Sequence, residues 1–279
     1  MAEQRLTRER IAANGLTFAV VDEGEGTPVV LLHGFPDSAD LWRNQVPALV
    51  DAGFRVIAPD LRGFGESDKP EEVDAYLMPN LMMDVTGIMD ALGVEQARVV
   101  GHDWGSVLAW MTTAFMPDRV ERLVAMSVGH PSTFQDASME QRQKSWYMLL
   151  FQFRGVAEEW LRADDWRNFR QFGGEAADIE RYVEDLSRPG ALEAGLAWYR
   201  ANIPPESLVA PPMPVPEIVA PTMGMWSTGD IALTEDLMTR SSDYVKGPWR
   251  YERVEGAGHW MQLDQPETVN RLLIDFLKG

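Results

Sequence analysis

The sequence predicts an α/β fold: a mostly parallel sheet flanked by helices and interrupted by a helical insertion. Short, wholly apolar runs such as 29–32 and 97–100 are typical of strands buried on both faces of a parallel sheet. Between them, residues 77–92 repeat apolar side chains at a period near 3.6, as an amphipathic helix does. Residues 131–216 then carry helical patterns and no convincing strand. Strands and helices that alternate in this way form a parallel sheet with helices on both faces.

The strands come as short segments along the chain. The first of them alternates and is rich in β-forming residues, whereas the next ones are continuous apolar runs. The predicted strands are 16–21, 29–32, 55–59, 97–100, 123–128, 222–226 and 250–254. In an open parallel sheet, chemistry takes place at the carboxyl ends of the strands. We therefore look for functional residues directly after each strand.

The helices lie between these strands. One is predicted over 77–92, another begins just after Asp103, and helical patterns return within 233–244. The last helix is predicted to start at Asp264. Asp264 and Glu267 have the spacing of a capping box, in which each side chain bonds a backbone N–H group of the first turn.

The helical insertion divides the chain into two parts. A proline-rich hinge, residues 211–216, ends the insertion, and strand patterns resume after it. We expect residues 1–130 and 217–279 to form the sheet core and residues 131–216 to form a helical lid over it.

Composition excludes several classes of protein. The 279 residues include 43 acidic and 25 basic side chains, a formal net charge of −18, so the surface repels nucleic acid and anionic membranes. The chain has no cysteine, which excludes thiolate chemistry. Residues 1–10 lack the apolar segment of a signal peptide, and no apolar run is long enough to span a membrane. We expect a cytoplasmic protein without a nucleic-acid partner, and a homodimer is compatible with the sequence.

Residues 101–105, Gly-His-Asp-Trp-Gly, follow the strand 97–100 and lead into a helix. This is the small-x-nucleophile-x-small spacing of a nucleophile elbow, a tight turn that exposes its central side chain at a helix N-terminus. The central residue is Asp103 instead of serine. A carboxylate can displace a leaving group from sp³ carbon and form an ester, which must then be hydrolysed. Asp103 therefore indicates an epoxide or a halide as the reacting group.

The rest of a catalytic triad follows in the order nucleophile, acid, histidine. His259 is the histidine that comes late enough in the chain. Asp230 follows the strand 222–226 and is the predicted acid, whereas Asp236 lies farther into the next helix. Asp230 would hold the tautomer of His259 and stabilise its charged form. The other histidines, which we expect to be structural, are His33, His102 and His130.

Backbone N–H groups complete the predicted site. Phe35 follows the strand 29–32 and Trp104 follows the nucleophile, so their N–H groups can form an oxyanion hole for hydrolysis of the ester. The histidines are scattered without the spacing of metal ligands, so we expect no metal and no other cofactor.

The side chains of the lid determine which leaving group the site can stabilise. An epoxide opens to an alkoxide, which needs a hydrogen-bond donor such as tyrosine, whereas a halide needs no proton. Tyr147 lies in an apolar stretch, and Tyr199 follows Ala197 and Trp198. Tyr182 stands among charged residues and is expected at the surface.

With these motifs, the sequence resembles the epoxide hydrolases of the α/β-hydrolase superfamily, from about residue 10 to residue 277. The matching segments are 33–36, 101–105, Tyr147 with 151–152, 198–200 and 258–260. The resemblance implies an eight-stranded α/β-hydrolase fold with a cap and a reaction that yields a vicinal diol. It also implies that Tyr147 and Tyr199 bind the epoxide oxygen.

Two neighbouring families fit less well. Haloalkane dehalogenases also resemble this chain at Asp103-Trp104, but they usually carry asparagine where this chain has Phe35. Fluoroacetate dehalogenases carry arginine where this chain has Trp104. The non-enzymatic alternative, a ligand-binding protein on the same fold, usually lacks a triad member.

The expected reaction needs only a small apolar epoxide and water. Asp103 forms the ester, and water activated by His259 cleaves it. The residues expected to line the substrate pocket are Phe35, Trp104, Phe151 and Trp260.

Overall fold

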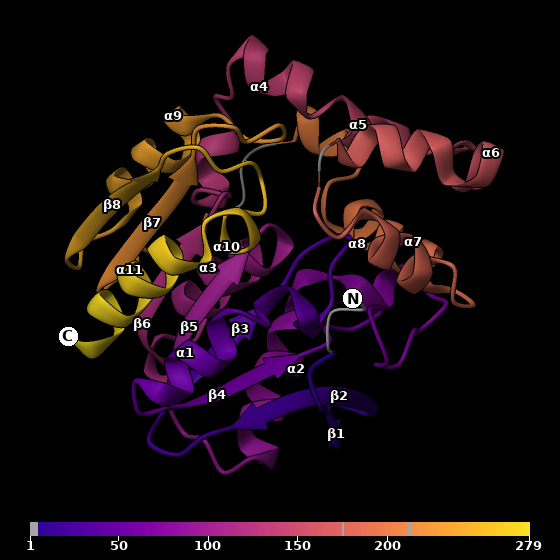
Figure 1. The fold of residues 1–279 in the computed structure, drawn as a ribbon. Helices are drawn as coiled ribbons and strands as arrows, with labels where there is room; N and C mark the ends of the chain where they lie inside the picture. The colour runs from indigo at the N-terminus through magenta and orange to yellow at the C-terminus, as the bar shows by residue number, and fades with distance from the viewer. Residues whose placement is uncertain (1–4, 175, 211–213) are drawn as a thin grey trace.

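The computed structural model describes residues 5–174, 176–210 and 214–279, built around an eight-stranded sheet (Figure 1). Its strands are β1 (Glu9–Ala13), β2 (Leu16–Glu23), β3 (Thr27–Leu32), β4 (Phe54–Pro59), β5 (Ala97–His102), β6 (Val120–Met126), β7 (Thr222–Ser227) and β8 (Trp249–Val254). They lie in the order β1-β2-β4-β3-β5-β6-β7-β8. β2 is antiparallel to β1 and β4, and the pairs from β4–β3 to β7–β8 are parallel. The predicted fold is confirmed.

Strand β1 is absent from the predicted strands because of its place at the sheet edge. Its first residues, Glu9 and Arg10, are exposed, so the segment shows no apolar run. Asn14 and Gly15, with φ of 46° and 77°, connect β1 to β2. Two successive residues with positive φ form the tight turn that Asn-Gly favours in a hairpin. This pair is the sequence feature that indicates β1.

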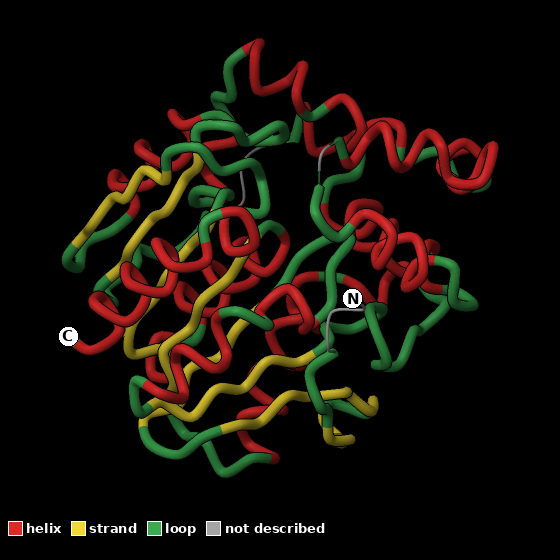
Figure 2. Tube along the Cα trace, in the orientation of Figure 1, coloured by secondary structure: helices red, strands yellow, loops and turns green. Residues whose placement is uncertain are grey.

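Helices cover both faces of the sheet, as Figures 1 and 2 show. α1 and α11 contact each other on one face, and α2 and α3 contact each other on the opposite face. The core helices are α1 (Gln45–Asp51), α2 (Met78–Ala91), α3 (Trp104–Phe115), α9 (Glu235–Thr239), α10 (Met261–Asp264) and α11 (Pro266–Lys278). The sheet is buried between these layers; the side chains of Val29, Leu31 and Val99 are fully inaccessible to solvent.

Five further helices lie in sequence between β6 and β7 and above the upper end of the sheet in Figure 1. They are α4 (Met139–Lys144), α5 (Trp146–Leu150), α6 (Val156–Gly173), α7 (Ile179–Leu186) and α8 (Ala191–Asn202). We call this segment the cap. The boundaries 131 and 216 stay a prediction, and residues 211–213 of the hinge lie outside the described residues. Within the described part of the chain, we find no helix long and apolar enough to cross a membrane.

The predicted start of the last helix is wrong. Two helices meet there: α10 ends at Asp264, and α11 begins at Pro266 with no side-chain hydrogen bond at its N-cap, Gln265. The Asp264 carboxylate instead accepts a hydrogen bond of 2.7 Å from the N–H of Gly258. Asp264 therefore supports the loop that leads to His259, and the predicted capping box does not form.

Candidate active site

Asp103 lies at the turn between β5 and α3, with φ of 55° and ψ of −123°. For a residue other than glycine, this backbone conformation costs on the order of 1–3 kcal/mol. Such strain is typical of functional sites. The turn is closely packed: a Cβ atom on Gly101 would collide with the backbone of Gly105, and one on Gly105 with the backbone of Leu32. The sequence therefore needs both glycines to hold Asp103 at the carboxyl end of β5.

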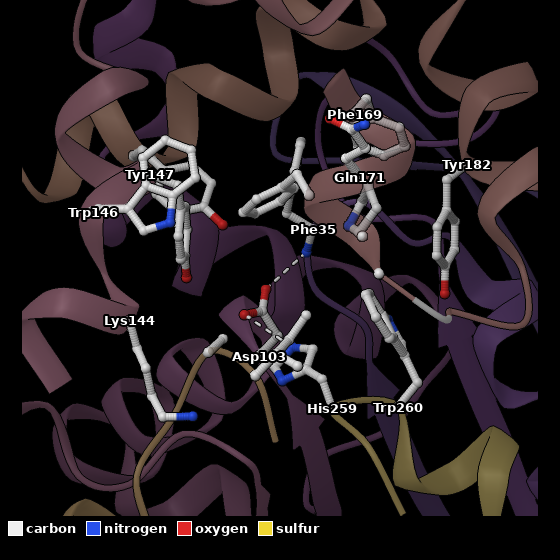
Figure 3. Close-up of a pocket in the computed structure, with 17 residues that line it drawn as sticks. Phe35, Asp103, Lys144, Trp146, Tyr147, Phe169, Gln171, Tyr182, His259 and Trp260 are labelled. Atoms are coloured by element: carbon white, nitrogen blue, oxygen red, sulfur yellow. Dashed lines mark hydrogen bonds and ion pairs between the residues drawn. The ribbon is translucent and has the colours of Figure 1, made fainter. Parts of the chain in front are cut away.

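The Asp103 carboxylate contacts the loop that follows β3. The N–H of Phe35 donates a hydrogen bond of 2.9 Å to Oδ1 of Asp103 (Figure 3). A Cβ atom on Gly34 would collide with the Asp103 side chain, which explains the glycine there. Among the described residues, the N–H of Trp104, the second predicted oxyanion donor, donates no hydrogen bond. Because Oδ1 is held by Phe35, Oδ2 is the oxygen without that bond.

His259 lies between two carboxylates. Its Nδ1 is 3.0 Å from Oδ2 of Asp230, and its Nε2 is 3.7 Å from Oδ2 of Asp103. Oδ1 of Asp230 also accepts hydrogen bonds of 2.8 and 2.9 Å from the N–H groups of Ala232 and Leu233. The predicted residues therefore come together in the order that a triad requires, although they come from three separate loops.

The electrostatics of this group are coupled. Burial alone would lower the pKa of His259, but the negative charges of Asp230 and Asp103 raise that pKa to about 10. Burial alone would raise the pKa of Asp230, but His259 and two backbone N–H groups lower it below its usual value. His259 is consequently charged at neutral pH for as long as Asp103 is not esterified.

The other histidines have structural contacts. Nε2 of His33 accepts a hydrogen bond of 2.9 Å from the N–H of Leu61, and Nε2 of His102 bonds the carbonyl of His259. Burial lowers the pKa of each of these two histidines, and that of His130, to about 4. They are therefore neutral near pH 7 and bonded to backbone groups.

Two buried tyrosines reach the site from the cap. Tyr147 lies on α5 and Tyr199 on α8; their ring centroids are 6.0 Å apart, and both are less than 5% exposed. Both tyrosines line the same cavity as Asp103 (Figure 3). Burial, and next the charge of Asp103, raise the pKa of both tyrosines above the usual value. Both hydroxyls therefore keep their protons and can donate hydrogen bonds.

A cavity of about 330 Å³ lies between the cap and Asp103. Its described lining is Phe35, Pro36, Asp103, Lys144, Trp146, Tyr147, Phe169, Gln171, Phe172, Gly173, Gly174, Tyr182, Tyr199, Ile231, Ala232, His259 and Trp260. Of the residues predicted to line the pocket, Phe35 and Trp260 line this cavity, whereas Trp104 and Phe151 do not. They lie behind it, with ring centroids 5.1 and 5.0 Å from that of Tyr199. The sequence motifs place these two aromatic residues near the site but do not show in which layer they lie.

The expected surface position of Tyr182 is wrong. Its side chain is 2% exposed, lines the cavity and interacts with the buried carboxyl of Asp37. Tyr182 shares the buried face of α7 with Leu186, while its charged neighbours Glu180 and Glu184 are exposed. The period of 3.6 along α7 is the sequence feature that reveals this burial.

Asp37 was not singled out from the sequence. It accepts a hydrogen bond of 3.0 Å from the indole N–H of Trp260, and burial raises its pKa to about 7.

Across the described ranges, no group of three or more histidine, cysteine or acidic side chains is arranged to hold a metal ion.

Comparison with known proteins first defines the class. Residues 27–266 match the family model of the alpha/beta hydrolase fold. Epoxide hydrolase A of Mycobacterium tuberculosis (strain ATCC 25618 / H37Rv) is 33% identical over 98% of each chain. The crystal structure of Epoxide Hydrolase A from Mycobacterium thermoresistibile covers 98% of both chains at 31% identity, with a TM-score of 0.82. The crystal structure of the Bacillus megaterium epoxide hydrolase in complex with an inhibitor matches with a TM-score of 0.88 at 26% identity. This match covers 97% of this chain and 100% of the other. The chain belongs to the epoxide hydrolase family of the α/β-hydrolase superfamily.

Proposed function

We propose that this protein hydrolyses epoxides to vicinal diols through a covalent ester on Asp103, with Tyr147 and Tyr199 as hydrogen-bond donors to the epoxide oxygen. One observation carries the proposal. The Asp103 carboxylate stands at a cavity into which two buried tyrosines project from the cap, with the His259–Asp230 pair on its other side. A halide would not need the tyrosines, because it leaves without a proton. The aromatic lining favours an apolar substrate body.

In the first step, Oδ2 of Asp103 attacks a ring carbon while Oδ1 keeps its bond to the N–H of Phe35. The new C–O bond forms the ester, and the ring C–O bond breaks to leave an alkoxide. Tyr147 and Tyr199 stabilise the developing charge on that oxygen, which then takes up a proton.

Ester formation also prepares His259 for the second step. The charge of Asp103 helps to raise the pKa of His259 to about 10. That charge disappears when the carboxylate becomes an ester, so the pKa of His259 falls and its proton is released. This proton balances the one that the alkoxide takes up. His259 thus becomes a base only after the ester has formed.

In the second step, neutral His259 takes a proton from water, and the hydroxide adds to the ester carbonyl. The N–H of Phe35 stabilises the resulting oxyanion on Oδ1. When the intermediate collapses, the alkyl oxygen leaves with the proton from His259 as the diol. Asp103 then returns its acid proton to His259, which restores the starting state.

The test is the intact mass of a His259→Gln variant after exposure to epoxides and to haloalkanes. Without the base the ester should persist, and the protein mass should rise by one whole epoxide. An Asp103→Ala variant is the control and should gain no mass.

Adducts from haloalkanes alone would contradict an epoxide hydrolase and identify a dehalogenase. A wild-type protein that binds epoxides without producing any diol would overturn the proposal in favour of a binding protein.

A further inference from the structure

Arg200 follows Tyr199 on α8, and its guanidinium group joins three helices of the cap. Its Nε donates a hydrogen bond of 2.8 Å to the carbonyl of Phe151, the residue that ends α5. Its Nη1 donates one of 2.7 Å to Oε1 of Glu158, in the first turn of α6. Oε2 of Glu158 accepts one of 2.8 Å from the N–H of Gly155, where the same helix starts. The helices α5, α6 and α8 of Figure 1 therefore meet at one side chain.

The two proposed donors to the epoxide oxygen are attached to this junction. Tyr199 directly precedes Arg200, and Tyr147 lies one helical turn before Phe151, whose N–H donates a hydrogen bond of 2.9 Å to the Tyr147 carbonyl. The ring of Phe151 packs on both tyrosines, with its centroid 5.4 Å from that of Tyr147 and 5.0 Å from that of Tyr199. The bond from Arg200 to Phe151 therefore fixes α5 relative to α8 next to the point where each helix carries its tyrosine.

Arg200 and Glu158 form a buried ion pair, with side chains that are 7% and 8% exposed. Burial alone would raise the pKa of Glu158, but the hydrogen bond from Arg200 lowers that pKa below its usual value. The pair is therefore charged at neutral pH. Apolar residues of similar volume often stabilise a protein as well as a buried ion pair does, so stability alone does not explain this pair. A planar guanidinium also holds its donors in a fixed arrangement, which sets the geometry of the groups that it bonds.

We propose that Arg200 is a positioning residue for the opening of the epoxide ring: it holds Tyr147 and Tyr199 at the separation at which both hydroxyls reach one epoxide oxygen. This inference rests on the proposed function and adds to it a residue that acts on the first step alone. Arg200 is not among the described residues that line the cavity at Asp103, so it acts through the tyrosines and not on the substrate.

The test measures ester formation by itself, in the His259→Gln background, in which the ester persists. The protein mass is followed over time with the epoxide that forms the ester fastest, and styrene oxide is tried first. Arg200→Met should slow ester formation by about 10–100-fold, because a displacement of about 1 Å in a positioned group has an effect of this size. Arg200→Lys keeps the charge but not the fixed pair of donors, so its rate should lie between those of Arg200→Met and the parent.

The decisive readout is the coupling between Arg200 and the two hydroxyls. In a protein in which Tyr147 and Tyr199 are both changed to phenylalanine, Arg200→Met should slow ester formation by less than about twofold, because the groups that it positions are gone. A general loosening of the cap would slow ester formation by the same factor with or without the hydroxyls. That result would overturn the inference.

Arg162→Met is the matched control. Arg162 also joins α6 to α8, through bonds of 2.8 and 3.1 Å to Glu193, but these side chains are 40% and 47% exposed. Its removal should leave ester formation unchanged. Urea unfolding verifies that each variant is folded, and Arg200→Lys carries the same comparison if Arg200→Met is not.

Two further outcomes separate the inference from the proposed function. If the folded Arg200 variants form the ester as fast as the parent, the inference fails and the proposed function stands. If the parent forms no ester with any epoxide, the proposed function fails, and the inference fails with it.

Discussion

Tyr147 and Tyr199 differ from a third buried tyrosine of the same cavity, Tyr182, in the group that each one faces. The charge of Asp103 acts on Tyr147 and Tyr199, whereas Tyr182 interacts with Asp37. Tyrosine hydroxyls that face Asp103, the proposed nucleophile, are the ones we propose as donors to the epoxide oxygen. The hydroxyl of Tyr182 instead lies near the buried carboxyl of Asp37, whose charge helps to raise the pKa of this tyrosine.

This difference predicts the effects of removing each hydroxyl. Changing both Tyr147 and Tyr199 to phenylalanine should lower kcat/KM by about 10²–10⁴-fold, the usual contribution of a positioned acid. Each single change should cost less, because the other hydroxyl still donates. Steady-state hydrolysis of one epoxide by the variants measures these losses. Tyr182→Phe is the control, and an equal loss in that variant would refute the assignment.

Among the elements, α4 connects the cap to the loop that carries Asp230, the proposed triad acid. Gln141 is 1% exposed, and its amide nitrogen donates a hydrogen bond of 2.8 Å to the carbonyl of Ala232. Its amide oxygen accepts one of 2.8 Å from the N–H of Thr234. The N–H of Ala232 in turn bonds the Asp230 carboxylate. One loop therefore positions the acid and fixes the start of the cap.

A Gln141→Leu variant should weaken both functions of this loop. It leaves the carbonyl of Ala232 and the N–H of Thr234 without their partners, at a cost of about 1–3 kcal/mol for each buried group. We expect a lower free energy of unfolding in urea and a lower kcat/KM. Gln143→Leu changes an exposed glutamine of the same helix and should alter neither. Unchanged activity in Gln141→Leu would show that the loop holds Asp230 without the cap.

The helices and strands also show which features local sequence patterns can predict and which they cannot. Apolar runs identified β3 and β5 because burial on both faces leaves a plain signature, and the glycines around Asp103 marked the turn. Contacts between distant segments had no such signature. The bond of Asp264 to Gly258 replaced an expected helix cap, and the burial of Tyr182 depends on how α7 packs over Asp37.

For the whole molecule, buried histidines set the pH range of stability. The pKa of His33, His102 and His130 is lowered to about 4, so their contribution is present above about 6.5 and is lost as the pH falls toward 4. The pKa of His259 is raised to about 10, so its contribution is present below about 6.5 and is lost as the pH rises through 10. Together these groups place the greatest stability near neutral pH.

The alkaline limb provides the sharper prediction, because His259 is the histidine whose pKa is raised. The folded protein binds one more proton than the unfolded chain between pH 6.5 and about 10, so the free energy of unfolding should fall across that range, by on the order of 3–5 kcal/mol. Urea unfolding at a series of pH values measures this slope. In His259→Gln the proton has no site, and the slope should largely disappear. An equally steep fall in that variant would mean that other groups cause it, and that His259 is not held in its charged form by Asp103 and Asp230.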